Sequence, residues 1–201
     1  QVEKYQELLA NGFYTTIKIA VLGLIIGILI GTIIASIKVA PKYKFIIRFL
    51  EKICDVYTAF FRGTPIMVQL LLAWYILFPM LGIQLDKNIV GILVFGFNSG
   101  AYVSEIMRSG LNSVDKGQME AGRAVGLSYL QTMIKIVIPQ AIKNILPTLG
   151  NEFIQLIKET SVLSFITITD LYKALKDIAM ANQQYEVVIP YLLLGVMYIV
   201  L

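Results

Sequence analysis

The feature that most restricts the fold is a series of long apolar segments separated by short polar ones. The candidates run over residues 13–37, 53–81, 89–107, 141–157 and 187–201. A bilayer core about 30 Å thick needs roughly 20 apolar residues in a helix. The chain is only 15% charged, whereas a soluble domain carries about 25% charged residues. The sequence therefore predicts an all-α integral membrane protein with about five transmembrane helices.

We expect one transmembrane domain over residues 1–201. The chain begins at Gln1 and stops at Leu201 inside an apolar run, so we expect it to be truncated, above all at the C-terminal end. The polar stretch 167–186 is expected to form a short helix on the outer surface.

Several function classes are disfavoured by composition. The chain has no histidine, the commonest catalytic base and metal ligand. Its single cysteine, Cys54, cannot form an internal disulfide or a zinc site alone. No phosphate-binding Gly-x-x-x-x-Gly-Lys-Ser/Thr motif occurs. We therefore expect no catalytic residue, metal or cofactor in this chain. We also expect no nucleic-acid partner, because the basic residues lie in loops between apolar runs.

Basic residues are concentrated in two of the predicted loops. The first loop contains Lys38, Lys42, Lys44, Arg48 and Lys52. The third loop contains Arg108, Lys116, Arg123 and Lys135. The opposite side has Lys4, Lys87, Lys173 and Lys176. Cytoplasmic loops are enriched in Lys and Arg. We therefore predict that the first and third loops and the C-terminus are cytoplasmic, and that the N-terminus lies outside.

The third loop is more than a connector. Residues 115–131 interleave apolar and polar side chains and predict an amphipathic helix, with Gly117 before it and Gly126 within it. An ordinary helix end at Gly126 is the alternative. Such a helix can rest on lipid headgroups. Its residues also resemble the signature loop of bacterial ABC-importer permeases, which reads Glu-Ala-Ala, three residues, Gly, nine residues, Ile-x-Leu-Pro. The matching positions here are Glu120-Ala121-Gly122, Gly126 and Ile136-Val137-Ile138-Pro139. Gly122 and Ile138 depart from the pattern.

Other segments are similar to the polar amino-acid permeases of the histidine, arginine and glutamine type. They are Phe61-Arg62-Gly63-Thr64-Pro65 with Val68-Gln69, Gly100-Ala101-Tyr102 with Glu105, and Gly150-Asn151-Glu152-Phe153 with Lys158-Glu159. The resemblance implies a type I importer permease in a bacterial inner membrane. It also implies a second permease subunit, identical or related, and a cytoplasmic ABC ATPase dimer that binds ATP and Mg. An extracellular or periplasmic binding protein would deliver the amino acid.

By the same resemblance, residues 115–139 form a cytoplasmic coupling loop between the third and fourth spans. Its coupling residues would be Glu120, Ala121, Gly122, Gly126 and Pro139. Small residues allow a partner backbone to approach closely. We expect Pro139 to stop the next helix from merging with the loop helix.

Ionisable residues inside a membrane cost about 2.5–3.5 kcal/mol on insertion scales and are candidate site residues. Glu152 lies deepest, and Gln155 and Glu159 follow at helical spacing, so all three are expected on one face. The alternative is a buried pair between Glu152 and Arg62 or Lys158. Glu105 and Asp55 are weaker candidates. Arg108 follows Glu105 by one turn, and Asp55 lies near the first loop.

The interruption at Gly63-Thr64-Pro65 predicts a break in the second span. Thr64 is expected to cap a half-helix that begins at Pro65. The positive end of such a half-helix can hold a substrate carboxylate. The alternative is a plain proline kink.

These residues together suggest a substrate site. Amides near Thr64, helped by Arg62, would bind the carboxylate of an amino acid. Glu152, with Gln69, Ser104 or Gln155, would bind an ammonium or guanidinium group.

The sequence therefore predicts the permease subunit of an ATP-driven importer for a basic amino acid such as arginine, lysine or histidine. One alternative is the same complex for a neutral or acidic amino acid such as glutamine or glutamate. Another is an ion-coupled transporter. An intramembrane enzyme is disfavoured because no nucleophile with a base is recognisable.

Overall fold

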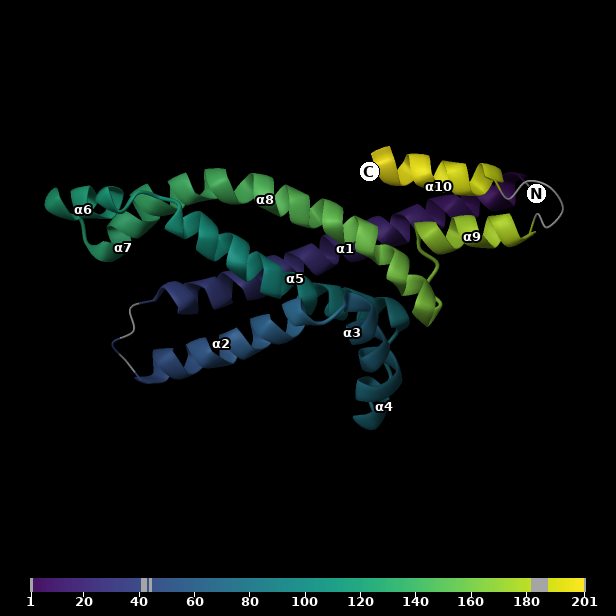
Figure 1. Cartoon of the computed structure of the whole chain (residues 1–201), viewed down its shortest axis with the longest axis horizontal. Coiled ribbons are helices and arrows are strands. Elements are labelled where there is room, and N and C mark those ends of the chain that lie inside the picture. The colour runs from purple at the N-terminus through teal and green to yellow at the C-terminus, as the bar shows by residue number, and fades with distance from the viewer. Residues whose placement is uncertain (1, 41–42, 44, 182–187, 201) are drawn as a thin grey trace.

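A computed structural model describes residues 2–40, 43, 45–181 and 188–200, and every regular element in them is helical (Figure 1). The long helices are α1 (Val2–Val39), α2 (Phe45–Gly63), α5 (Lys87–Asn112) and α8 (Ile138–Glu159). The short ones are α3 (Ile66–Leu72), η1 (Ala73–Leu77), α4 (Phe78–Met80), α6 (Lys116–Ala124), α7 (Tyr129–Thr132), η2 (Met133–Val137), η3 (Thr160–Ile166), α9 (Leu171–Ala181) and α10 (Val188–Val200). The predictions at Gln1, Lys42, Lys44, residues 182–187 and Leu201, and at the side chain of Lys4, lie outside the described residues.

Helices α1 and α5 form the most extensively packed helix pair and run in the same direction. Three glycines of α1 recur every four residues and face α5 in order: Gly23 faces Phe95, Gly27 faces Ser99, and Gly31 faces Val103. A Cβ added at these glycines would lie 2.6 to 3.0 Å from the facing side chains. In membranes, small residues at this spacing let two helix backbones pack closely.

The second predicted span is broken. The chain bends by 104° between helix α2 and the helix Ile66–Met80, which comprises α3, η1 and α4. Figure 1 shows α3 and α4 turned away from the long axis of the bundle. The break at residues 63–65 is confirmed, and the bend is far larger than a plain proline kink.

Two π-helical turns each end shortly before a proline. Helix η1 ends two residues before Pro79, and η2 ends two residues before Pro139. Proline has no amide hydrogen, and its ring clashes with the carbonyl four residues earlier. A π turn is a known way to accommodate such a residue inside a helix. Helices α7, η2 and α8 therefore continue without interruption from Tyr129 to Glu159, and the expectation that Pro139 separates them is wrong.

The number of spans is only partly supported by length and composition. Helices α1 and α5 are long and apolar enough to cross a membrane, and the bent α2–α4 pair adds a third candidate. Helix α8 has 22 residues but carries several charges, and α10 is described over 13 residues. The expectation of about five spans stays a prediction for α8 and α10.

The short helix expected within residues 167–186 is present as α9, and it packs against the bundle. It packs against α1, where a Cβ on Gly12 would lie 2.8 Å from Ala174 Cβ. The hydroxyl of Thr16 accepts a hydrogen bond from the Leu171 amide at 3.1 Å. Leu171 and Ala174 are both fully buried. The polar residues of α9 therefore cover one side of a helix whose other side belongs to the bundle.

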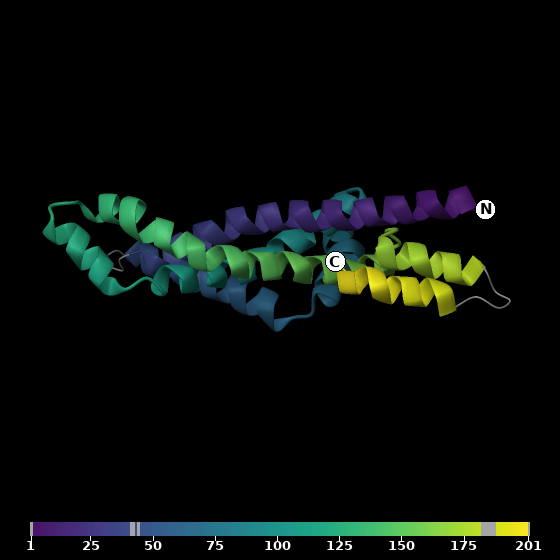
Figure 2. The same ribbon diagram turned by 90° about the horizontal axis from the view of Figure 1, so that it is seen from above.

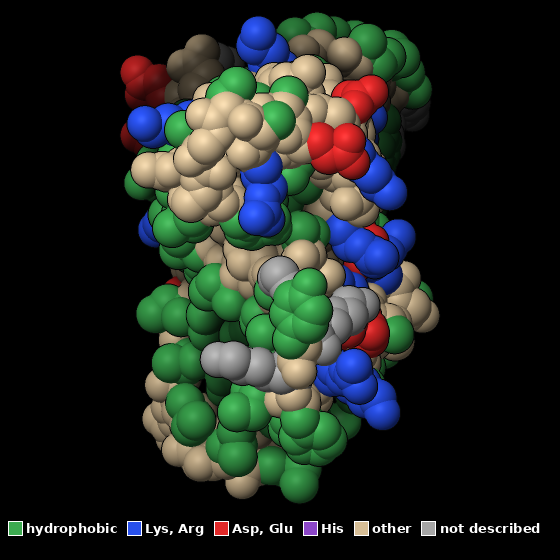
Figure 3. All heavy atoms as spheres, turned by 90° about the vertical axis from the view of Figure 1, so that its left-hand side faces the viewer, with side chains coloured by type: hydrophobic (Ala, Val, Ile, Leu, Met, Phe, Trp, Pro, Cys, Tyr) green, Lys and Arg blue, Asp and Glu red, His purple; other side chains and the backbone are tan. Residues whose placement is uncertain are grey.

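The two ends of the bundle carry different connections. The end of α1, the start of α2, and helices α6 and α7 lie at one end, and the N-terminus and α9 lie at the other (Figures 1 and 2). The first and third loops are therefore on the same side, as the charge pattern predicts. Figure 3 looks onto this end and shows Lys and Arg side chains spread over it. Which end faces the cytoplasm stays a prediction.

Candidate functional site

Glu152 is a buried carboxylate of α8 that faces α5. Its Oε1 accepts a hydrogen bond from Ser99 Oγ at 2.9 Å. Ser99 is fully buried, and Glu152 is 6% exposed. Among the described residues, no lysine or arginine forms an ion pair with Glu152. A buried ionised carboxylate without a cation is costly, so Glu152 is a site that a cation would stabilise.

The two cations considered as partners of Glu152 lie elsewhere. The Arg62 guanidinium, at the end of α2, lies 5.6 Å from the centre of the Tyr102 ring of α5. This geometry is a cation–π contact. Lys158 and Arg62 are both exposed. The structure therefore does not contain the buried helix-pairing salt bridge that was the alternative for Glu152.

The break between α2 and α3 is held by side chains that satisfy the last carbonyls of α2. The Thr64 hydroxyl donates to Phe60 O at 2.8 Å. The Gln69 Nε2 lies 3.0 Å from both Phe61 O and Thr64 O. Asn98 of α5 donates from Nδ2 to Gln69 Oε1 at 3.0 Å. Without these donors the carbonyls at the helix end would lack partners.

The predicted cap at Thr64 is therefore wrong. The residue that precedes α3 is Pro65, and no side chain of the described residues caps that helix. Thr64 instead completes the last turn of α2. The Gln69 side chain of α3 donates across the break to the carbonyls of Phe61 and Thr64. Asn98 was missed by the sequence analysis. An amide side chain inside an apolar span is the signal that could have found it.

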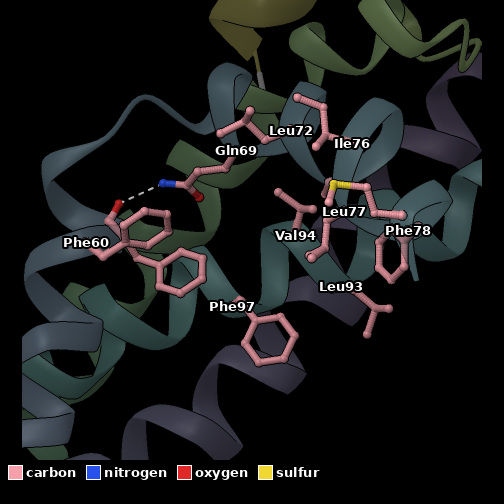
Figure 4. Close-up of a pocket in the computed structure, with 12 residues that line it drawn as sticks. Phe60, Gln69, Leu72, Ile76, Leu77, Phe78, Leu93, Val94 and Phe97 are labelled. Atoms are coloured by element: carbon pink, nitrogen blue, oxygen red, sulfur yellow. Dashed lines mark hydrogen bonds between the residues drawn. The ribbon is translucent and has the colours of Figure 1, made fainter.

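An apolar cleft of about 340 Å³ lies beside the break. It is lined by Phe60, Phe61, Gln69, Leu72, Ala73, Ile76, Leu77, Phe78, Met80, Leu93, Val94 and Phe97 (Figure 4). Gln69 is the only polar side chain among these lining residues, and both ends of its amide are already hydrogen bonded. A zwitterion placed there would lose its hydration without gaining a polar partner. The cleft is therefore a poor place for an amino acid.

Asp55 and Glu105 are brought together by Lys38, at the end of α1. Lys38 Nζ lies 3.1 Å from Asp55 Oδ1 and 3.0 Å from Glu105 Oε1. It also donates to Thr58 Oγ1 at 3.2 Å. Arg108 adds a longer contact of 3.8 Å to Glu105, so the predicted local pair is present. This Lys38 network joins α1, α2 and α5, and it supplies both carboxylates with a cation from the protein itself.

The remaining predicted site residues are not bonded to Glu152. Gln155 is exposed and donates from Nε2 to Glu159 Oε1 at 3.1 Å. Ser104 is fully buried and donates to Ala101 O in its own helix at 2.7 Å. The polar stripe expected along α8 is therefore divided. Glu152 faces α5, whereas Gln155 lies on the surface of the chain.

The loop between α5 and α8 contains two helices rather than one. Asp115 accepts from the Gly117 amide at 2.6 Å and begins α6. Gly126 has φ +93°, and its amide donates to Arg123 O at 3.0 Å. The Leu127 amide donates to Gly122 O at 3.1 Å. This pair of bonds is a Schellman motif, which ends a helix at a residue with positive φ. Gly126 therefore ends α6, which confirms the alternative of a helix end over a position within the helix.

The predicted coupling residues do not share one surface. Glu120 and Ala121 are exposed, whereas Gly122 is buried. A Cβ on Gly122 would lie 2.4 Å from Thr132 Cγ2, so Gly122 is the position where α6 packs onto α7. Pro139 is exposed in the first turn of α8. The structure thus presents Glu120 and Ala121 on a short helix at one end of the bundle.

Known proteins are similar to this chain over most of its length. Residues 23–201 match the family described as "Binding-protein-dependent transport system inner membrane component". The putative glutamine transport system permease protein GlnP of Rickettsia bellii (strain RML369-C) is 37% identical over 88% of this chain and 79% of that protein. The arginine transport system permease protein ArtQ of Bacillus subtilis (strain 168) is 37% identical over 95% of this chain and 84% of that protein. The L-cystine transport system permease protein TcyB of the same strain is 34% identical over 93% of this chain and 77% of that protein.

Solved structures show the same fold. One, the crystal structure of an amino acid ABC transporter with histidines, is 37% identical and matches with a TM-score of 0.86 over 99% of this chain and 89% of that chain. An inward-facing structure of the MetNI methionine ABC transporter matches with a TM-score of 0.71 over 98% of this chain and 93% of that chain, at 17% identity. At that identity the likeness concerns the fold alone.

Proposed function

Because the chain belongs to the family of binding-protein-dependent transport system inner membrane components, we propose that it is the permease subunit of an ATP-driven amino-acid importer. The relatives are named for glutamine, arginine and cystine, so they share amino acids as a class but not one substrate. A family that depends on a binding protein favours this proposal over a free-standing ion-coupled transporter.

The proposal assigns the other functions to partner subunits. ATP and Mg are bound by a cytoplasmic ABC ATPase dimer, and an extracellular or periplasmic protein delivers the amino acid. A second permease subunit, a copy of this chain or a relative, completes the path through a bacterial inner membrane. The exposed helix α6, with Glu120 and Ala121, is the surface that we assign to the ATPase.

The observation that carries the substrate proposal is the unpaired Glu152. Glu152 is 6% exposed, and the hydrogen bond to its carboxylate comes from a neutral hydroxyl. A substrate ammonium or guanidinium would supply the missing positive charge in a poorly hydrated place. This favours a basic amino acid such as arginine, lysine or histidine. Glutamine or glutamate would offer only the ammonium that all amino acids share.

The substrate carboxylate needs a different partner. Arg62 is exposed at the end of α2 and is held by an aromatic ring rather than by a carboxylate. We assign the substrate carboxylate to Arg62. Thr64 and Gln69 have their polar groups engaged at the helix break, and we assign them to holding the break open rather than to substrate contact.

Replacing Glu152 by Gln tests the substrate site in the assembled importer. The change keeps the shape of the side chain and removes its charge. We expect arginine affinity to fall roughly ten- to a hundredfold, because a hydrogen bond to a charged group contributes about 1.5–3 kcal/mol. Glutamine should lose less. Thr148→Ala, which changes an exposed residue one turn earlier on the same helix, is the control. Unchanged affinity for every amino acid tested would remove Glu152 from the site.

Replacing Glu120 by Arg tests the ATPase surface. The residue is exposed on α6, so the fold should persist while ATP hydrolysis no longer depends on substrate delivery. Gly126→Leu is a poorer test, because φ +93° strains any larger residue whatever its role. Normal coupled transport by Glu120→Arg would place the ATPase contact elsewhere.

A further inference from the structure

We propose that Ser99 of α5 and Gly27 of α1 are positioning residues that hold the Glu152 carboxylate of α8 toward the cationic group of the substrate. The inference rests on the proposed function. It adds that preference for a cationic amino acid depends on a three-helix arrangement and not on Glu152 alone.

Ser99 anchors one oxygen of the carboxylate and leaves the other open. The Ser99 hydroxyl donates to Glu152 Oε1 at 2.9 Å. Oε2 has no hydrogen bond to a described residue. It is also not fully enclosed, because the buried side-chain oxygen without a partner among the described residues is that of Tyr198. A bond from a hydroxyl to a carboxylate is stronger than one between neutral groups. The carboxylate is therefore fixed at Oε1 and can offer Oε2 to a ligand.

Gly27 determines where the Ser99 hydroxyl can lie. A Cβ on Gly27 would be 2.6 Å from Ser99 Oγ and 2.8 Å from Ser99 Cβ. The backbone of α1 therefore fills the space behind the Ser99 side chain, which is fully buried. Only a residue without a side chain leaves room for the hydroxyl in its observed rotamer, directed across α5 at α8.

The neighbouring glycines separate positioning from packing. Gly31 approaches α5 as closely as Gly27 does, with a Cβ position 2.7 Å from Val103 Cγ1. Val103, however, is an apolar residue and cannot hydrogen bond to Glu152. If Gly27 only let α1 and α5 pack together, Ala at position 27 and Ala at position 31 should have similar effects. If Gly27 positions Ser99, only the first should alter substrate preference.

The experiment measures uptake by the complete importer in proteoliposomes, with arginine and glutamine as the two probes. The readout is the ratio of their KM values, which a loss of folded protein does not change. Ser99→Ala should lower the preference for arginine about three- to tenfold, the value of one hydrogen bond. Gly27→Ala should lower it similarly, and Gly31→Ala should leave it unchanged. In a Glu152→Gln background, Ser99→Ala should have no further effect, because the two residues act as a unit.

Each outcome decides between the parts of the argument. If Glu152→Gln lowers the preference but Ser99→Ala does not, positioning by Ser99 is overturned while the role of Glu152 stands. If Gly31→Ala lowers the preference as much as Gly27→Ala, Gly27 acts through helix packing and its positioning role is overturned. If Glu152→Gln changes nothing, both the substrate site and this inference fail. Should Gly27→Ala prevent assembly, Ser99→Ala and its combination with Glu152→Gln decide alone.

Discussion

Replacing Lys38 by Met tests whether the Lys38 network holds helices α1, α2 and α5 together. The lysine ammonium contacts Asp55, Glu105 and Thr58 within 3.2 Å. The methionine side chain is unbranched and nearly as long as that of lysine, but it is apolar and carries no charge. The substitution therefore leaves two carboxylates near each other with no cation from α1 between them.

The magnitude follows from the exposure of the partners. Removing one partner of a fully buried pair costs about 3–5 kcal/mol, whereas an exposed pair contributes about 0–1 kcal/mol. The Lys38 side chain is 3% exposed, but Asp55 is 60% and Glu105 is 30% exposed. Both carboxylates can recover water once the lysine is gone. We therefore expect a loss of about 2–3 kcal/mol in the free energy of unfolding.

The assay is reversible denaturant unfolding in mixed micelles, followed by circular dichroism. Lys52→Met, which changes an exposed lysine of the next helix, is the matched control and should stay within about 0.5 kcal/mol of the wild type. Adding Glu105→Gln to Lys38→Met should recover about 1 kcal/mol, because it removes one of the unpaired charges. A Lys38→Met protein as stable as the control, or a double variant that loses the sum of the single losses, would refute the network.

Three other predictions concern separate parts of the chain. Gly122→Ala should lose about 1–3 kcal/mol of stability, because its Cβ would lie 2.4 Å from Thr132 Cγ2; adding Thr132→Ser removes that methyl group, and failure to recover stability in thermal unfolding would contradict the contact. Burial raises the pKa of Asp170, in the connection before α9, from 3.8 to about 6, so the folded state binds this proton more tightly than the unfolded state. The stability from this group is therefore fully present below about pH 4 and is lost as the pH rises through about 6. Asp170→Asn should therefore remove a pH dependence of order 3 kcal/mol from the free energy of unfolding between about pH 4 and pH 6. A variant with the same pH dependence as the wild type would show that another group is responsible. Cysteines introduced at Lys116 and Lys173 in a protein without Cys54 should be labelled from the cytoplasmic and the outer side respectively, and the reverse pattern would invert the predicted orientation.

One local prediction in the connecting loop failed, and one open alternative was decided. Pro139 was expected to separate two helices, but a π turn carries the helix past it. Gly126 could lie inside a helix or end one, and it ends α6. Proline and glycine make a continuous helix costly at a position but do not forbid it. Packing of Gly122 against Thr132 requires the chain to turn between the two helices, and it turns where positive φ costs least.

The candidate site was predictable in part. Glu152 stands out in the sequence because a carboxylate in an apolar run needs a reason to be there. Its partner Ser99 does not stand out, since a serine in an apolar helix usually bonds to its own backbone. Lys38 was assigned to loop charge, and only the structure shows that it neutralises Asp55 and Glu105. Gly27 belongs to a repeat of glycines that could have been recognised as a helix-packing signal.

The sequence by itself determined that this protein lies in a lipid bilayer and that its long segments are helical. Apolar segments of this length must be helical in a bilayer, because every backbone polar group there needs an internal partner. The tertiary structure alone decided which polar side chains meet. Periodicity places a residue on a face of its own helix, but the angle and register between helices depend on packing across the whole bundle. For that reason Asp55 and Glu105 obtain a cation within the chain, and Glu152 obtains a serine hydroxyl and no cation from the described residues.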